Sequence, residues 1–266
     1  AAGYLAKLAR HREAVAAEFH HPVSGNFFAS IAISLLLLSS VLAPHGEALS
    51  QALWTLGVVA TLVIGYVIVS RVLRGGLAQG AVVPAWLIPG VATLDIPVTG
   101  AHMSMAWAHE VNLLATGIGT AVAIVFFTMI FSRLVRQEAL PKSMAPSLMV
   151  LVAPFEVGFL AYTNLVGRVD LFASMLFYVG LFVFLVLAPK VFRRDVPFST
   201  AWWGISFPLA ALANAALKYA AASGGVVLEG LAIALLAFLT LSLAVLFVRP
   251  SGAAQHEDVP HRTPGR

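Results

Sequence analysis

The sequence contains a series of apolar runs, each about 20 residues long, separated by short polar segments. A helix of that length crosses the roughly 30 Å hydrocarbon core of a bilayer, and continuous runs favour helices over the alternating strands of a barrel. A mean hydropathy of +0.91 with 11% charged residues excludes a soluble globular domain. We therefore predict an all-α polytopic membrane protein with eight spans, at residues 24–43, 51–73, 83–103, 111–132, 144–165, 171–192, 199–221 and 227–248.

Basic residues are segregated between the loops that these spans define. Fourteen lie in the terminal segments and loops of one side, whereas the loops at 44–50, 104–110, 166–170 and 222–226 hold only Arg168. Because loops rich in lysine and arginine stay in the cytoplasm, we expect both visible ends of the chain to be cytoplasmic. The same asymmetry explains the pI of about 9.7 without a nucleic-acid partner.

Prolines divide the spans into two kinds. The second, fourth and eighth spans contain none, and the sixth has only Pro189 near its end. Proline inside a membrane helix requires neighbours or a water-filled cavity to satisfy the freed backbone. The pattern therefore predicts tandem helical hairpins, each with one kinked inner helix beside a central path, although the first span has no internal proline. The internal prolines are Pro89 and Pro97 in the third span, Pro146 and Pro154 in the fifth, and Pro208 in the seventh.

The seventh span carries the first candidate site. Pro208 cannot donate to the carbonyl of Gly204, so we expect a kink near Phe207. Lys218 follows Phe207 by eleven residues, which places it on nearly the same helix face and about 16 Å further along. Either this face lines a polar route, with Phe207 as a gate and Lys218 attracting anions, or Lys218 only extends to the membrane interface.

Two acidic residues lie deep in proline-containing spans. Asp95 and Glu156 are each about 18 Å from the predicted cytoplasmic surface. Placing an ionisable residue at that depth costs free energy. Asp95 and Glu156 are therefore both candidates for pore electrostatics. The alternative is a neutral carboxyl that is hydrogen-bonded to backbone freed by proline.

The sequence offers little for catalysis or for metal binding. It contains no cysteine, and His109-Glu110 lacks the second histidine of a metalloprotease motif because that position is Leu113. No nucleophile–base pair or phosphate loop is evident. We therefore expect a protein that is not an enzyme and that has no metal site and no cofactor.

Three segments resemble one known family, the slow-type plant guard-cell anion channels and the bacterial TehA tellurite-resistance and C4-dicarboxylate transporters. The segments are EFHHPVSGNFFAS (Glu18–Ser30), EALPKSMAPSLMVLVAPFEVGFLAY (Glu138–Tyr162) and AWWGISFPLAALANAALKYA (Ala201–Ala220). They occur in the family's order, and the similarity covers most of residues 4–248.

The resemblance implies ten membrane helices in five hairpins, five inner helices around a pore, and a homotrimer with one pore in each protomer. By that register the first visible span is similar to the family's third helix, Tyr4 to Ala17 is similar to the tail of the second, and the first hairpin is absent from this sequence. The resemblance also places the family's occluding phenylalanine at Phe207, which agrees with the kink expected at Pro208.

These observations together predict a channel for small monovalent anions such as chloride or nitrate, in a bacterial inner membrane. The alternative is a proton-coupled transporter of a C4-dicarboxylate such as malate, or an efflux carrier for tellurite or sulfite. A polytopic membrane enzyme is a third hypothesis, but it would need a catalytic cluster. The expected organisation is a cytoplasmic segment at 1–23, a transmembrane anion-channel domain at 24–248 and a disordered cytoplasmic tail at 249–266.

The segregation of basic residues predicts the topology. Reporter domains fused after Val248 should be cytoplasmic, and reporters inserted at 222–226 should be periplasmic, since the arginine-rich and lysine-rich loops are retained inside. Alkaline phosphatase and fluorescent-protein activities measure the two locations. The opposite pattern would invert the whole assignment.

Overall fold

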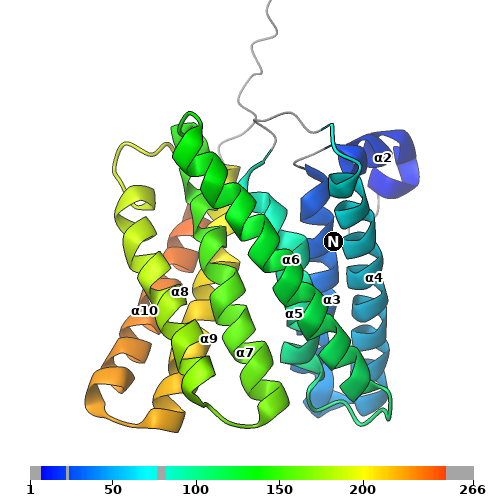
Figure 1. The fold of residues 1–266 in the computed structure, drawn as a ribbon, viewed down its shortest axis with the longest axis vertical. Helices are drawn as coiled ribbons and strands as arrows, with labels where there is room; N and C mark the ends of the chain where they lie inside the picture. The colour runs from blue at the N-terminus through cyan, green and yellow to red at the C-terminus, as the bar shows by residue number, and fades with distance from the viewer. Residues whose placement is uncertain (1–6, 22–23, 77–81, 250–266) are drawn as a thin grey trace, which may run out of the picture.

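The computed structural model describes residues 7–21, 24–76 and 82–249, and all regular secondary structure in these ranges is helical (Figure 1). The prediction of an all-α fold is confirmed. Apart from Arg249, the tail predicted to be disordered lies outside the described residues.

Eight of the helices form four hairpins that follow one another along the chain. The two helices of each hairpin pack against each other. A nine-residue helix, α2 (Arg12–His20), precedes them. The hairpins are α3 (Ala29–Leu42) with α4 (Glu47–Leu73), α5 (Ile88–Gly100) with α6 (Ala108–Arg136), α7 (Ala153–Val166) with α8 (Leu171–Val191), and α9 (Ser206–Ser223) with α10 (Val226–Val248).

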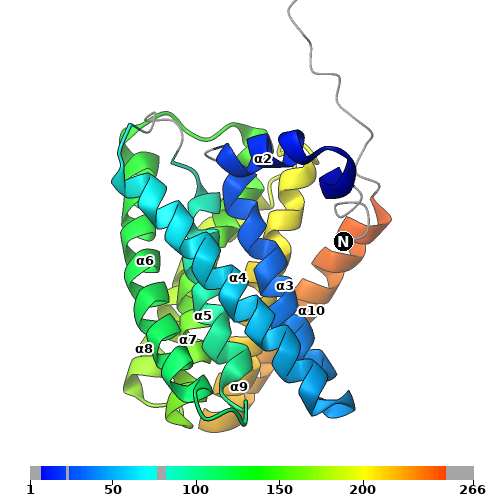
Figure 2. The ribbon, with the colours of Figure 1, turned by 90° about the vertical axis from the view of Figure 1, so that its right-hand side faces the viewer.

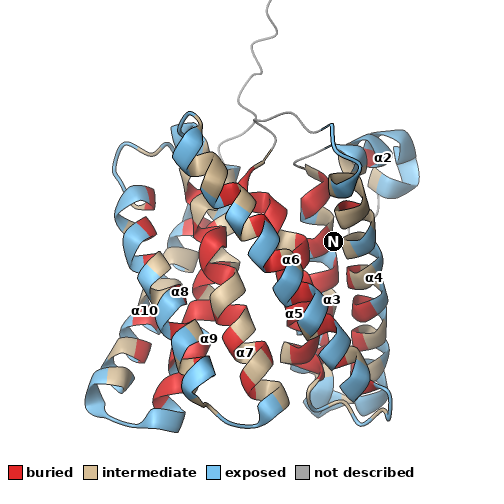
Figure 3. Cartoon of the chain, viewed as in Figure 1, coloured by how far each residue is buried: buried red, intermediate tan, exposed pale blue. Residues whose placement is uncertain are grey.

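The first helix of each hairpin is an inner helix. Successive inner helices pack together, α3 on α5, α5 on α7 and α7 on α9. The second helices, α4, α6, α8 and α10, expose apolar faces on the outside, as the burial pattern in Figure 3 shows. This arrangement matches the division that the prolines predict.

Each inner helix begins as a tight 3-10 helix and then widens into an α-helix. Proline explains the change in three of the four, because Pro89, Pro154 and Pro208 lie in the first turn of the α-helical part and cannot donate a backbone hydrogen bond. The 3-10 segments are η1 (Ser24–Phe28) before α3, η4 (Pro84–Leu87) before α5, η5 (Lys142–Val152) before α7, and η6 (Thr200–Ile205) before α9.

The chain order brings the basic residues to one end of the bundle. The segments that leave α4, α6 and α8 lie there, with Arg71, Arg74, Arg133, Arg136 and Arg193. We call this the basic end. The short helix α2 crosses the same end, near the start of α3 (Figure 2). Arg168 lies at the opposite end, in the loop between α7 and α8.

The prediction of a bilayer-length helix is not confirmed for residues 83–103. Seven helical segments of the described chain are long and apolar enough to cross a membrane, and α5 is not among them. The four residues of η4 and the 13 of α5 together give about 28 Å of helix, and every residue from Pro89 to Gly100 except Val98 is buried. Neighbouring helices surround α5, so it does not need the length of a helix that faces lipid.

Side chains of three neighbouring helices satisfy the carbonyl groups at the end of α5. Trp54 Nε1 of α4 donates to Ile96 O at 3.2 Å, Asn164 Nδ2 of α7 donates to Val98 O at 2.8 Å, and Asn112 Nδ2 of α6 donates to Gly100 O at 2.9 Å. A helix normally leaves its last four carbonyls without intrahelical partners. Asn164 and Asn112 pair two of these four carbonyls, those of Val98 and Gly100, and Gly100 O also accepts from Met103 N at 3.1 Å.

Gly100 tests this arrangement. A Cβ at Gly100 would lie 2.4 Å from the Trp54 ring and 2.5 Å from Asn112 Oδ1. Gly100→Ala should therefore lower the free energy of unfolding by about 1–3 kcal/mol, as overpacking does. Thermal melting in detergent micelles measures the effect.

Gly117→Ala is the matched control, because a Cβ at Gly117 meets nothing within 4 Å. That variant should be as stable as the native protein or gain up to about 1 kcal/mol from helix propensity. Equal stability of the two alanine variants would show that the end of α5 is not tightly packed.

Candidate functional site

A cleft of about 840 Å³ lies where the four inner helices change from 3-10 to α-helix. Side chains from η1 and α3, η4 and α5, η5 and α7, and η6 and α9 all contribute to its wall. No charged residue lines the cleft within the described ranges. Its polar lining consists of hydroxyl groups among apolar side chains, namely Ser30, Ser34, Ser147, Thr200 and Ser206.

Phe207 lines this cleft from α9. Its half-buried ring packs against the cluster of Ala29 and Ile33 in α3 with Ala92 in α5. The ring therefore extends from α9 to the two inner helices that begin the bundle. Of the sequence candidates, Phe207 and the buried Pro208 are the ones that the structure brings to the cleft wall.

Pro208 lies in the first turn of α9, one residue after Phe207. The kink expected there takes the form of the change from η6 to α9 between Ile205 and Ser206. Gly204, whose carbonyl loses its α-helical donor at Pro208, also lines the cleft. The sequence thus identifies the position of the backbone irregularity, and the structure shows its form.

Lys218 lies further along α9 and does not line the cleft. Its half-buried ammonium donates a hydrogen bond to Asn164 Oδ1 of α7, and Asn164 in turn donates to Val98 O of α5. The cation is therefore held by two inner helices, on the side of Phe207 away from the basic end. Sequence reasoning missed Asn164, since an asparagine near the end of a span carries no distinctive signal.

The structure places Glu156 away from the cleft. Its side chain is fully buried, and a Cβ at Gly180 of α8 would lie 2.1 Å from Glu156 Oε1. The carboxyl group therefore occupies the space between α7 and α8 that the glycine leaves. Both carboxyl oxygens lack a hydrogen-bond partner in the described part of the chain. We do not assign Glu156 a role in pore electrostatics.

Asp95 is also buried, with 2% of its surface exposed, and its Oδ2 has no hydrogen-bond partner among the residues described. It is absent from the cleft wall. The two acids that the sequence singles out are thus both inside the helix bundle, and neither contributes to the lining of the cleft.

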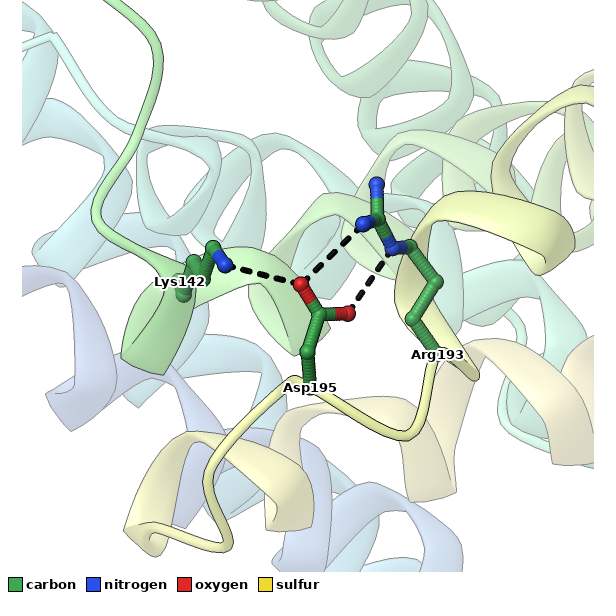
Figure 4. A network of polar contacts seen from close by, with 3 residues as sticks. All are labelled: Lys142, Arg193 and Asp195. Atoms are coloured by element: carbon green, nitrogen blue, oxygen red, sulfur yellow. Dashed lines mark hydrogen bonds and ion pairs between the residues drawn. The ribbon is translucent and has the colours of Figure 1, made fainter.

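A polar network fastens the basic end beside the cleft. Lys142 Nζ donates to Asp195 Oδ2 at 2.8 Å, and Arg193 Nε donates to Asp195 Oδ1 at 2.8 Å (Figure 4). These hydrogen bonds, with that from Lys142 the largest, lower the pKa of Asp195 from its ordinary value. Ser199 Oγ adds a bond to Ser143 O at 2.8 Å. The contacts join the start of η5 to the loop before η6, and both segments supply side chains to the cleft.

Comparison with known proteins identifies a matching family. Residues 1–250 match the family described as voltage-dependent anion channel, SLAC1. The S-type anion channel SLAH2 of Arabidopsis thaliana is 30% identical over 249 residues, which are 91% of this chain and 47% of the relative. The guard cell S-type anion channel SLAC1 of the same plant is 29% identical over 252 residues, 92% of this chain and 45% of the relative.

A bacterial relative is covered more completely. The tellurite resistance protein TehA homolog of Haemophilus influenzae is 28% identical over 248 residues, which are 91% of this chain and 73% of the relative. The chain spans less than half the length of the two plant channels.

Proposed function

Since this chain belongs to the voltage-dependent anion channel family, we propose that it passes small monovalent anions, such as chloride or nitrate, between its inner helices. The observation that carries the proposal is the cleft, which the four inner helices line and which Phe207 borders from α9. Phe207 acts as the constriction, and Pro208 sets the backbone that presents its ring.

The chemistry of the cleft wall supports passage rather than tight binding. Conduction requires a site that an ion enters readily and leaves readily. The hydroxyls of Ser34, Ser147 and Ser206 already donate to backbone carbonyls and so bind an anion weakly. A lysine or arginine in the wall would hold an anion, and an aspartate or glutamate would repel it. The described wall has hydroxyls and no charged group of either sign.

Positive potential on both sides of Phe207 supports the choice of anions. All four inner helices start at the basic end, so the positive ends of their dipoles face it, together with the arginines of that end. Lys218 lies beyond the ring on the other side. An anion approaching the constriction from either side therefore meets favourable electrostatics.

Orientation and assembly complete the proposal. The excess of basic residues at one end supports a cytoplasmic location for the basic end. The seven apolar helices make the chain a multi-pass membrane protein. The family resemblance supports a homotrimer in a bacterial inner membrane.

A proton-coupled transporter of a C4-dicarboxylate, or an efflux carrier for tellurite or sulfite, is the second candidate. Buried carboxyl oxygens without partners, both in Glu156 and Oδ2 in Asp95, favour it because these groups could bind and release protons. Similarity to the Haemophilus influenzae TehA homolog, which is named for tellurite resistance, also favours a carrier. Anion current in liposomes without a proton gradient supports the channel, whereas uptake that requires a proton gradient supports the carrier.

Removal of the Phe207 ring tests the constriction. Phe207→Ala should raise chloride and nitrate flux severalfold, because the change widens the hydrophobic narrowing without adding charge. The measurement is anion flux into liposomes that contain the complete chain, with protein amount and folding matched between variants.

Phe182→Ala is the control, since Phe182 of α8 is 66% exposed on the outside of the bundle. It loses the same ring and should keep the native flux. Native flux in a well-folded Phe207→Ala variant would make Phe207 a packing residue and would remove it from the path.

Lys218 tests the electrostatic part of the proposal. Lys218→Glu should lower anion flux, and the decrease should be largest at low ionic strength, because salt shortens the Debye length from about 30 Å at 0.01 M to about 8 Å at 0.15 M. Lys218→Gln keeps a donor for Asn164 but removes the charge, so its flux should lie between the native and glutamate values. Equal flux in all three proteins at low salt would exclude Lys218 from the electrostatics of the path.

A further inference from the structure

Asp95 lies in α5, one helical turn beyond the part of that helix that lines the cleft. Ile88 and Val91 belong to the cleft wall, and Asp95 follows them by seven and four residues. Residues at these spacings share one face of an α-helix. The Asp95 side chain is therefore on the same face of α5 as the cleft, about 6 Å further from the basic end than Val91.

Neighbouring helices occupy two other faces of α5. A Cβ at Gly119 of α6 would lie 2.8 Å from Leu94 Cγ, so Leu94 faces α6. A Cβ at Gly65 of α4 would lie 3.8 Å from Thr93 Oγ1, so Thr93 faces α4. The face of α5 that carries Asp95 is thus turned toward the other inner helices.

The Phe207 ring lies between Asp95 and the basic end. The ring packs against Ala92, and Asp95 follows Ala92 by three residues, about 4.5 Å along α5. One turn beyond Asp95, Asn164 donates to the backbone of α5 and accepts from Lys218. Along the axis of the bundle, Asp95 therefore lies between the Phe207 ring and the Lys218 ammonium group.

The Asp95 carboxyl group has no compensating partner in the described part of the chain. Its Oδ2 is buried without a hydrogen bond, and none of the ion pairs formed there includes it. A buried carboxylate costs free energy when no cation or donor stabilises it. Ionisable residues in such positions mark ion pathways and proton-binding sites in membrane proteins.

Other charged and titratable groups near α5 lie toward the ends of the bundle or toward other neighbours. The segments η1, η4 and α3 contain none. Those of α4 and α6 lie in terminal turns, apart from Tyr66, which is 76% exposed. Glu156 faces α8, Tyr219 stacks on a ring of α8, and Tyr162 donates to Asp170. The groups considered are Glu47, Tyr66 and Arg71 of α4, His109, Glu110, Arg133 and Arg136 of α6, Glu156 and Tyr162 of α7, and Lys218 and Tyr219 of α9.

We propose that Asp95 is the proton-binding residue of the anion path, just beyond Phe207. Ionised Asp95 repels an anion on that side of the ring, whereas protonated Asp95 allows the anion to pass between the ring and Lys218. This inference rests on the proposed function and adds to it the regulation of passage by pH. Glu156, which faces α8, has no part in this regulation.

Anion flux tests the role of the carboxyl group, in liposomes that contain the complete chain and have the same pH on both sides. Native flux should rise about tenfold or more as pH falls through the range in which Asp95 takes up a proton, because like charges a few ångströms apart repel strongly outside bulk water. Asp95→Asn, a neutral isostere, should give the acidic flux at every pH. Glu156→Gln, the matched control, should keep the native pH profile.

A second measurement locates position 95 without depending on flux. The chain contains no cysteine, so Asp95→Cys and Glu156→Cys each introduce a single thiol. A small water-soluble methanethiosulfonate then labels the protein in detergent. Phe207→Ala should increase the labelling rate of Asp95→Cys severalfold, because water enters where the ring is removed, and should leave that of Glu156→Cys unchanged.

The outcomes separate this proposal from the proposed function. No anion flux through the native protein at any pH would contradict the proposed function. Flux with a native pH profile in a well-folded Asp95→Asn variant, or a profile lost in Glu156→Gln instead, would overturn the assignment of Asp95 alone. Equal labelling of Asp95→Cys with and without the Phe207 ring would also overturn it, because position 95 would then not lie beside the ring.

Discussion

Lipid provides no hydrogen-bond partners, so the backbone of each membrane helix must be satisfied within the protein. The short inner helix α5 depends most on this constraint. In its last turns, Trp54 donates to the carbonyl of Ile96, Asn164 to that of Val98 and Asn112 to that of Gly100. The same contacts fix α4, α6 and α7 around α5, and thereby fix the wall of inner helices that borders the cleft.

The change from 3-10 to α-helix in the inner helices connects this scaffold to the cleft. A 3-10 helix is narrower than an α-helix and turns its side chains differently, so each junction redirects the residues on either side. The cleft lies at the level of these junctions, with Phe207 two residues into α9. The network around Asp195 then joins the two 3-10 segments η5 and η6 at the basic end.

The buried acids show how far sequence reasoning extends to individual side chains. The distance of Asp95 and Glu156 from the ends of their predicted spans indicated that both carboxyl groups lie deep in the membrane, and both are buried. The position of a residue along its span does not determine which neighbouring helix its side chain faces. Glu156 faces α8 because Gly180 leaves space there, and that pairing joins residues of different helices. The polar groups of the cleft wall, in contrast, are serine and threonine hydroxyls, which carry no hydropathy signal.

The sequence by itself determined the helical class, the pairing of helices into hairpins and the segregation of basic residues, because hydropathy, proline and charge act locally along the chain. It also located the backbone irregularity next to Phe207 and Pro208, since a proline irregularity is a local property of the backbone. Only the tertiary structure decided that α5 is enclosed by its neighbours, that Lys218 bonds Asn164, and that Glu156 fills the space left by Gly180. Each of these depends on contacts between helices far apart in sequence, and no local pattern encodes which side chains will meet.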